Sequence, residues 1–377
     1  MRSSDLEVVE LDNKVHPDLQ PMFAQIPVID FTDLETIRSP SILPPAERVA
    51  GVVISDREIP GPDGAPTVWI RVYEPVGKEA DIPAVLWIHG GGYILGTHEQ
   101  DDGLCQRFVD EGKCLVASVN YRLAPEHPFP AAIEDCYAAL KWLADSAEEL
   151  GVDRNRIAIA GASAGGGLTA ALALLARDRG GPSICFQMPL YPMLDDRNVT
   201  PSSHEIRDER VWNRQTNIAA WQMYLTGSVS GDGRGSMDGS AGDAADAGGG
   251  AGASSSTDVG ARGALVTGRL DVGSDTGSAA VSPYAAPTRA EDLSGLPPCY
   301  TCVGGADVFR DETIEYVTRL QQAGVPVEFH IYPGGFHGFE LFVPDAPISQ
   351  RAVNEYVGAL VRGLQPVNAN LRWTPSP

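Results

Sequence analysis

Short apolar runs alternate with longer amphipathic segments along most of the chain. Runs rich in Val, Ile, Leu and Tyr and bounded by Gly, Pro or Asp are typical of strands. They cover residues 51–59, 67–72, 84–88, 114–119, 156–160, 185–190, 299–304 and 327–332. The first two flank the turn sequence GPDG, which predicts a hairpin. Most of the later six are almost continuously apolar, as expected for strands buried on both faces of a parallel sheet.

Helical patterns separate these runs. They cover residues 131–144, 163–177 and 311–323, and a last one covers 348–364. Alternation of strands and helices along the chain is typical of sheets whose parallel strands are joined by crossover helices. The sequence therefore predicts an α/β fold with a mostly parallel, eight-stranded sheet and helices on both faces.

Two segments do not follow this alternation. The first 48 residues predict short helices with an apolar face, and a second helical pattern covers residues 211–225. The apolar positions of the first segment are Leu19, Met22, Phe23, Ile26 and Pro27. We expect residues 1–48 and 196–226 to form a helical cap over one end of the sheet, and residues 49–195 and 281–377 to form the core.

Residues 227–280 differ in composition from the rest of the chain. They hold 15 of the 41 glycines and have neither an aromatic residue nor a proline. Such a segment buries too little apolar surface to offset the entropy of ordering it, which predicts a flexible insert. A tolerated surface loop is the simpler interpretation, and a regulatory or partner-binding segment is the alternative.

The net charge of −22 argues against electrostatic binding to nucleic acid or to an anionic membrane. The longest apolar runs, residues 83–88 and 168–176, are far shorter than the about 20 residues of a membrane span. No secretory signal is visible at the N-terminus, so we expect a soluble, cytoplasmic protein. The six cysteines are scattered, and Cys299 and Cys302 lie three apart on a predicted strand, where they face opposite sides. We therefore expect buried structural thiols, which suit neither a shared metal nor a redox pair.

The first chemical signal is Ser163 in the sequence GASAG, directly after the run 156–160 and directly before a helical pattern. A strand-to-helix turn of this type holds the serine hydroxyl up for attack, and small flanking residues allow the tight backbone. A helix that merely starts with small residues is the alternative. The context favours Ser163 as a nucleophile.

The second signal is the sequence HGGGY, residues 89–93, at the end of the run 84–88. Three consecutive glycines cost chain entropy. They leave backbone N–H groups free to face a developing oxyanion. A plain flexible turn is the alternative, whereas a phosphate loop is excluded because neither GxGxxG nor GxxxxGK[ST] is present. We expect His89 to brace this loop.

A nucleophilic serine needs a base and an acid that orients the base. Of the seven histidines, His337 lies in a loop just after the last predicted strand, where an α/β sheet presents functional groups. The acid should lie between Ser163 and His337 in the chain, after another strand. Asp307 satisfies this best, with Asp311 and Asp195 as alternatives.

Taken together, the chain resembles the hormone-sensitive-lipase-like (bacterial family IV) esterases of the α/β-hydrolase superfamily. The resemblance rests on HGGGY, VNYRLAPEHPFPAAIEDCYAALKWL, IAGASAGGGL, LPPCYTCVGGADVFRDE and YPGGFHGF, in the family's order. It implies an α/β-hydrolase fold, and a triad of Ser163, Asp307 and His337. It also implies an oxyanion hole formed by the N–H groups of Gly91, Gly92 and Ala164. The chain departs from the family at Ala162, where Asp or Thr is more common, and in its long insert.

The expected reaction is hydrolysis of a small ester with a short acyl chain, through an acyl-enzyme intermediate. This mechanism needs neither a metal nor an organic cofactor. Deacetylation or amide hydrolysis of an aryl or sugar substrate would use the same triad and stays an alternative. A non-catalytic small-molecule binder on this fold is a third possibility. The resemblance is also compatible with a homodimer formed through the last strand and helix.

Overall fold

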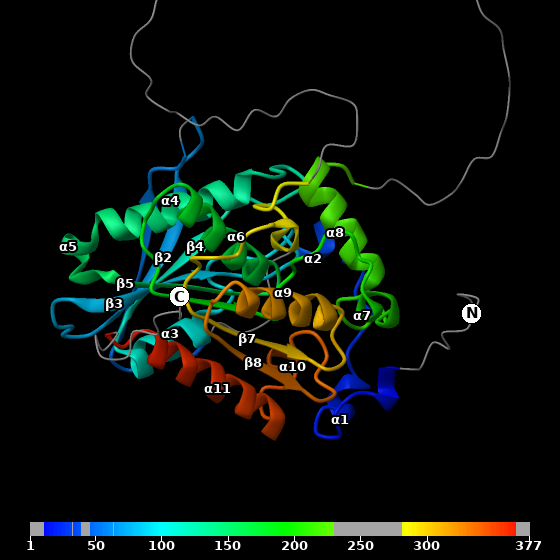
Figure 1. The fold of residues 1–377 in the computed structure, drawn as a ribbon. Helices are drawn as coiled ribbons and strands as arrows, with labels where there is room; N and C mark the ends of the chain where they lie inside the picture. Colours follow the sequence, from blue (N-terminus) through cyan, green and yellow to red (C-terminus); the bar gives the residue numbers. More distant parts are fainter. Residues whose placement is uncertain (1–10, 32, 39–45, 63, 230–280, 367–377) are drawn as a thin grey trace, which may run out of the picture. The chain divides into compact units, whose positions relative to one another are not determined.

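The computed structural model describes residues 11–31, 33–38, 46–62, 64–229 and 281–366. Within these ranges, eight strands form one sheet in the order β1-β2-β4-β3-β5-β6-β7-β8 (Figure 1). The strands are β1 (Val52–Ile59), β2 (Val68–Pro75), β3 (Ile82–Ile88), β4 (Leu115–Asn120), β5 (Val152–Ala162), β6 (Phe186–Leu190), β7 (Cys299–Gly304) and β8 (Val327–Tyr332). All eight predicted strands are therefore confirmed.

The sheet is antiparallel at one edge and parallel elsewhere. β1 pairs with β2 from Val52↔Pro75 to Ile59↔Val68, which confirms the predicted hairpin, and β2 also pairs antiparallel with β4. The remaining pairs, from β4–β3 to β7–β8, are parallel. Every residue of β3, β6 and β7 is buried, whereas the edge strand β8 is only partly buried because nothing pairs with its outer side within the described chain.

Helices cover both faces of this sheet (Figure 1). On one face lie α3 (Asp102–Gly112) and α11 (Pro347–Gly363), and on the other lie α4 (Ala131–Asp145), α6 (Ala164–Asp178) and α9 (Arg310–Gln322). The short helix α5 (Ala147–Leu150) follows α4, and α10 (Phe339–Phe342) precedes α11. The four predicted helices agree with α4, α6, α9 and α11 to within a residue at each end, whereas the apolar pattern did not indicate α3, α5 or α10.

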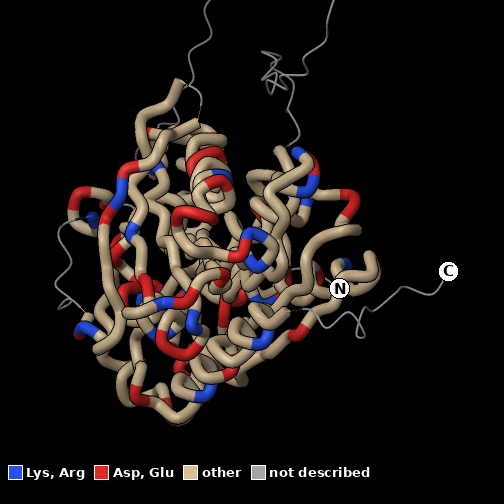
Figure 2. Tube along the Cα trace, turned by 90° about the vertical axis from the view of Figure 1, so that its left-hand side faces the viewer, with Lys and Arg blue, Asp and Glu red and all other residues tan. Residues whose placement is uncertain are grey.

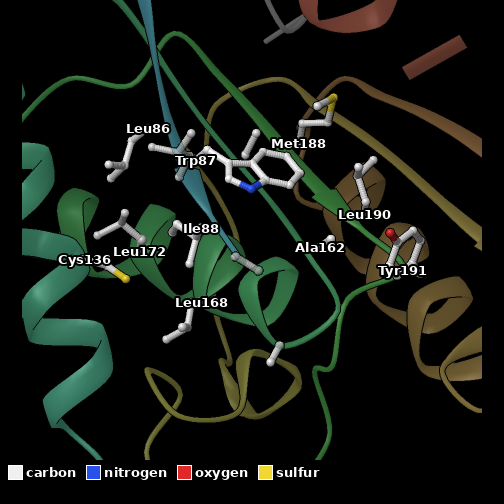
Figure 3. Close-up of a cluster of buried hydrophobic side chains, with 14 of the residues drawn as sticks. Leu86, Trp87, Ile88, Cys136, Ala162, Leu168, Leu172, Met188, Leu190 and Tyr191 are labelled. Atoms are coloured by element: carbon white, nitrogen blue, oxygen red, sulfur yellow. The ribbon is translucent and has the colours of Figure 1, made fainter. Parts of the chain in front are cut away.

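Alternating side chains of β3 pack against the helices on the two faces of the sheet (Figure 3). Ile88 faces Leu168 and Leu172 of α6, while Trp87 lies on the opposite side of the strand. The Trp87 ring packs against Phe108 of α3, with 5.6 Å between the ring centroids. Both faces of the strand are therefore buried, which explains its continuously apolar sequence.

Four α-helices lie in the described parts of the two segments expected to form a cap: the short helices α1 (Gln20–Phe23), α2 (Leu34–Ile37) and α7 (Pro201–Glu205), and the longer α8 (Arg214–Thr226). Leu19 and Phe23 are buried as predicted, whereas Met22 is 46% exposed. The helix predicted over 211–225 begins later, at Arg214, because residues 209–212 form a turn and the Asn213 side chain then caps the helix by accepting hydrogen bonds from the Gln215 and Thr216 amides. Of residues 227–280, predicted as a flexible insert, 230–280 lie outside the described residues, while Gly227 caps the end of α8.

Charged positions of both signs are interspersed along the trace (Figure 2). None of the helices in the described ranges has the length and apolar character needed to cross a membrane. All six cysteines are free thiols, five of them buried and Cys185 partly exposed. Burial raises the pKa of Cys114 to about 12, so this thiol stays protonated and unreactive at neutral pH.

Candidate active site

Ser163 occupies a strained turn between β5 and α6. Its φ of 58° and ψ of −117° lie in a region that costs a residue other than glycine about 1–3 kcal/mol. Several hydrogen bonds impose this conformation: its N–H donates to the Leu190 carbonyl at 2.9 Å, and its carbonyl accepts from the Met193 and Gly167 amides at 3.0 and 2.9 Å. The turn therefore presents the hydroxyl at the carboxyl end of the sheet, as the GASAG sequence predicts.

Glycines around Ser163 are required by close backbone contacts. A Cβ on Gly165 would lie 2.0 Å from the Ile88 carbonyl oxygen, and one on Gly167 would lie 2.2 Å from the Met193 carbonyl oxygen. The Ile88 carbonyl lies at the buried end of β3, and Met193 is held by the hydrogen bond from its own amide to the Ser163 carbonyl, so neither oxygen can move away freely. These glycines therefore let α6 begin directly beside β3.

His337 lies between Ser163 and Asp307. Its Nε2 is 2.9 Å from Ser163 Oγ, and its Nδ1 is 2.9 Å from Asp307 Oδ2. Ser163 is 7% exposed and Asp307 1% exposed. With the ring proton on Nδ1 donated to Asp307, Nε2 is free to accept the hydroxyl proton of Ser163. The structure thus brings together the three residues that the sequence singled out from different strand ends.

The two alternative acids have other partners. The Asp311 carboxylate pairs with Arg310 at 2.7 Å and accepts a hydrogen bond from the Ser202 amide. Asp195 pairs with Arg197 at 2.7 Å. Neither carboxylate has a hydrogen bond with His337, so the geometry favours Asp307, as predicted.

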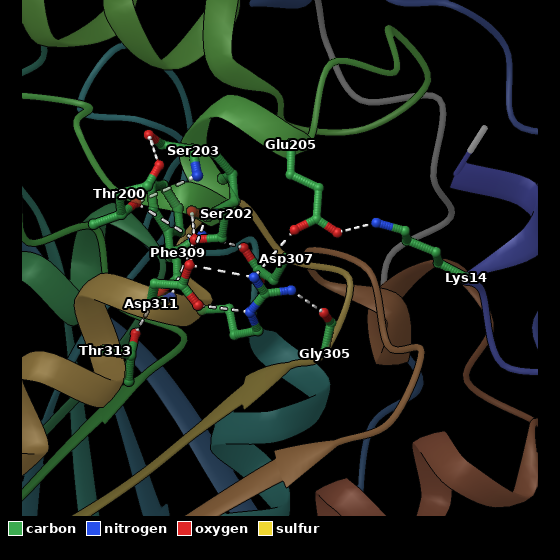
Figure 4. Close-up of polar contacts among 12 residues, drawn as sticks. Lys14, Thr200, Ser202, Ser203, Glu205, Gly305, Asp307, Phe309, Asp311 and Thr313 are labelled. Atoms are coloured by element: carbon green, nitrogen blue, oxygen red, sulfur yellow. Dashed lines mark hydrogen bonds and ion pairs between the residues drawn. The ribbon is translucent and has the colours of Figure 1, made fainter. Parts of the chain in front are cut away.

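A polar network holds the loop that carries Asp307 (Figure 4). Arg310 donates to the Gly305 carbonyl at 2.9 Å and pairs with Glu205 of α7 at 3.1 Å. Glu205 also pairs with Lys14 from the N-terminal segment. This network connects both segments of the expected cap to the Asp307 loop.

Aromatic rings surround the His337 imidazole. Phe309 and Tyr191 meet it edge-on at centroid distances of 5.0 and 5.3 Å, and Trp212 lies at 6.5 Å. Only 11% of the His337 side chain is exposed. Exclusion of water by these rings strengthens the hydrogen bonds of the imidazole.

The glycine loop lies directly beside Ser163. A Cβ on Gly90 would be 3.5 Å from Ser163 Cβ. Gly91 and Gly92 have φ values of +115° and +60°, which side chains rarely tolerate. Ala164 opens α6, so its amide has no acceptor within the helix. In the described part of the chain, no residue accepts a hydrogen bond from the amides of Gly91, Gly92 or Ala164, so all three are available to a ligand.

His89 has a bracing geometry. Its Nδ1 is 2.7 Å from the Gly90 carbonyl, its ring stacks on Tyr121 at 4.2 Å, and the Tyr121 hydroxyl donates to its carbonyl. Burial lowers the pKa of His89 to about 4, so the ring is neutral at pH 7 and donates from Nδ1. This agrees with the expectation that His89 supports the loop and does not transfer protons.

One group in the described chain has the composition of a metal site. Ligand atoms of Asp56, His98 and Glu99 lie within 4.8 Å of one another. Arg71, however, pairs with Asp56 at 2.7 Å and with Glu99 at 2.6 Å, and so already compensates both carboxylates. The group lies at the β1 edge of the sheet, away from the β5–α6 turn.

Sequence reasoning missed two buried carboxyl groups and an indole near the site. Glu312 is 1% exposed and accepts from the Leu194 and Asp195 amides, and burial raises its pKa well above the usual value. Burial also raises the pKa of Glu340. Trp212 reaches the site from the segment before α8. Nothing in the sequence around Glu312 and Glu340 indicated that they are buried. The helical pattern predicted over 211–225 includes Trp212 but did not show that its indole reaches His337, because that contact joins remote segments.

Residues 85–240 and 267–341 match a family model described as alpha/beta hydrolase fold. The chain belongs to the α/β hydrolase family. This α/β hydrolase is 34% identical over 311 residues to esterase LipI of Mycobacterium tuberculosis, covering 81% of each chain. It is 32% identical over 356 residues to carboxylesterase NlhH of the same species, covering 92% of this chain and 97% of NlhH.

A solved structure of a bacterial heroin esterase superposes on this α/β hydrolase with a TM-score of 0.76 at 38% identity, covering 94% of this chain and 99% of the other. These three relatives are all named as esterases. The resemblance to the hormone-sensitive-lipase-like esterases, drawn from the motifs, is thereby confirmed, and so is the α/β-hydrolase fold.

Proposed function

We propose that the protein is a serine carboxylesterase that hydrolyses small esters with short acyl chains. The observation that carries the proposal is the continuous hydrogen-bonded chain from Ser163 Oγ through His337 to Asp307, beside three unpaired amides. The esterase names of the relatives support the reaction class.

In the first step, Ser163 Oγ attacks the ester carbonyl carbon while its proton passes to His337 Nε2. The amides of Gly91, Gly92 and Ala164 stabilise the oxyanion. The tetrahedral intermediate collapses when the alkoxide leaves with the proton from His337, so that the acyl group stays on Ser163. Asp307 keeps the imidazole oriented and stabilises its charged form. A water molecule then attacks the acyl-enzyme while its proton passes to His337 Nε2. The second tetrahedral intermediate collapses when Ser163 takes this proton back, and the carboxylic acid is released.

We further propose that residues 1–48 and 196–226 act as the cap, of which the structure describes 11–31, 33–38, 46–48 and 196–226. Trp212 and the network of Lys14 and Glu205 support this role, because they join these segments to the catalytic loops. We expect this cap to enclose the substrate pocket and so to favour short acyl chains over long ones. A cytoplasmic location and a homodimer stay predictions.

The test is hydrolysis of p-nitrophenyl esters from acetate to palmitate by the native protein and by Ser163→Ala. We expect a maximum at short chains and a loss of several orders of magnitude in the variant, with an unchanged circular dichroism spectrum. Folded native protein without activity on any ester would refute the proposal. A matched panel of p-nitroanilides separates ester from amide hydrolysis, because faster anilide cleavage would favour the amidase alternative.

A further inference from the structure

Arg38 fastens the N-terminal segment to the loop that carries the oxyanion glycines. Its Nε donates to the Ile94 carbonyl at 2.7 Å, and its Nη2 donates to the Ala124 carbonyl at 2.6 Å. The same guanidinium binds Glu126 through both carboxylate oxygens, at 2.7 and 3.0 Å. One side chain therefore joins α2 to two loops that lie 56 and 86 positions further along the chain.

The carbonyl that Arg38 binds belongs to the same turn as the oxyanion amides. The Ile94 and Leu95 amides both donate to the Gly91 carbonyl at 3.0 Å, which closes residues 91–95 into one turn. The Tyr93 carbonyl accepts from the Ala124 amide at 2.9 Å. Arg38 thus binds this turn directly at the Ile94 carbonyl. It also binds the carbonyl of Ala124, whose amide is hydrogen-bonded to Tyr93 of the same turn.

The turn needs such an external constraint. Gly91 has no side chain that restricts its backbone, so the direction of its amide depends on the contacts around it. Oxyanion stabilisation requires donors 2.7–3.1 Å from the place where the charge develops. A small rotation of the turn would take the Gly91 and Gly92 amides out of this range.

We propose that Arg38 is a positioning residue for the oxyanion hole, holding the turn of residues 91–95 in the orientation that points its amides at the substrate. This inference rests on the proposed esterase function. The planar guanidinium is suited to the role because it bonds two carbonyls and a carboxylate at fixed angles, which a lysine ammonium does not.

The contribution of Arg38 should appear in catalysis and not in folding. The Glu126 side chain is 54% exposed and that of Arg38 is 26% exposed, and ion pairs in such positions add little stability. Loss of the guanidinium is therefore expected to loosen the turn without unfolding the protein.

The test compares Arg38→Gln, Arg38→Lys and Glu126→Gln with the control Arg179→Gln. Arg179 also binds a glutamate through both oxygens, Glu134 at 2.9 and 2.6 Å, but joins α6 to α4 away from the glycine loop. The readouts are kcat and KM for p-nitrophenyl butyrate, and inhibition by a trifluoromethyl ketone. Its carbonyl carbon bonds to Ser163 Oγ, and its oxygen takes the negative charge in the same hole.

We expect Arg38→Gln to lower kcat by about 10- to 100-fold at nearly constant KM, less than the about 10²–10³-fold for outright removal of an oxyanion donor. Inhibitor affinity should fall by a similar factor. Glu126→Gln should lower kcat less, because Arg38 still donates to the Ile94 and Ala124 carbonyls. Arg38→Lys should have a kcat between those of Arg38→Gln and the native protein. Arg179→Gln should have the native kcat.

Arg38→Gln with native kcat and native inhibitor affinity would overturn the inference, even if KM rose or the melting temperature fell. An equal loss in Arg179→Gln would overturn it as well. Neither of these two results would contradict the proposed esterase function, as long as the native protein hydrolyses the ester and Ser163→Ala does not. A native protein without ester hydrolysis would overturn the proposed function, and this inference with it.

Discussion

The indole of Trp212 lies directly against Gly92: a Cβ built on that glycine would meet the indole Cη2 at 2.1 Å. The ring is fixed on its other sides, because its Nε1–H donates to Asn217 at 3.1 Å and Phe31 meets it edge-on at 5.4 Å. With His337 at 6.5 Å, Trp212 extends from the oxyanion loop toward the base. It therefore narrows the space beside the proposed oxyanion hole, where we expect the ester to bind.

Trp212→Ala should widen the range of accepted esters. Removal of the indole opens space beside Gly92 and His337, so kcat/KM for bulky esters should rise relative to that for acetate. The same change should destabilise the fold by about 3–5 kcal/mol, as for other buried aromatic residues. The measurement is the ratio of kcat/KM for p-nitrophenyl octanoate and acetate, with Trp142→Ala on α4 as the control. An unchanged ratio would show that Trp212 does not border the substrate.

Asp307→Asn should lower kcat by about 10⁴-fold with little change in KM, because an amide favours the wrong tautomer of His337. Asp311→Asn is the matched control, since Asp311 lies four residues away and binds Arg310 and Ser202. The measurement is kcat and KM of the two variants for p-nitrophenyl butyrate, and only Asp307→Asn should lose most of its kcat. Equal losses in both variants would contradict the assignment of Asp307 as the orienting acid.

Gly165→Ala should reduce both stability and turnover. A Cβ there would lie 2.0 Å from the Ile88 carbonyl oxygen, and overpacking of this kind costs about 1–3 kcal/mol. Gly358→Ala on α11 is the control, because its Cβ would meet only the end of the Arg362 side chain, at 3.4 Å. That variant should be neutral or more stable by up to about 1 kcal/mol, since alanine favours helix. Urea unfolding measures the stability of the two variants, and ester hydrolysis measures their turnover. A Gly165→Ala variant with native stability would contradict the packing argument.

Asp101→Asn should make the protein more stable at pH 8 but not at pH 4. Burial raises the pKa of Asp101 to about 6, although its carboxylate accepts a hydrogen bond from Trp87 Nε1 at 2.8 Å. The folded protein therefore holds a proton that the unfolded chain has lost, and this group's contribution to stability falls as pH rises from about 4 to about 6. The amide oxygen keeps the Trp87 bond without the charge.

The difference in unfolding free energy between Asp101→Asn and the native protein should thus grow by at most about 3 kcal/mol between pH 4 and pH 8. Urea titrations at both pH values measure it. A difference that does not depend on pH would mean that Asp101 ionises as readily in the folded as in the unfolded protein.

Much of the core was predictable because local pattern and tertiary environment agree. The apolar runs of β3 and β7 are buried on both faces, and Ser163, Asp307 and His337 each follow a strand of the parallel part of the sheet. Parallel strands bring their carboxyl ends to one edge, so residues that follow different strands meet there. Chain order and motif context were therefore enough to anticipate that Ser163 and His337 meet at this edge, and to favour Asp307 among three candidate acids.

The sequence by itself determined the strand and helix periodicity, the glycines that backbone contacts require and the residues at the strand ends. Only the tertiary structure decided that Asp307, and not Asp311 or Asp195, reaches His337, that Trp212 borders Gly92, and that Arg38 holds the turn at Ile94. The physical reason is that periodicity reports which side of a segment is buried. Contacts between remote segments depend on how those segments pack. The sequence around Trp212 or Arg38 does not indicate which distant residue each will contact.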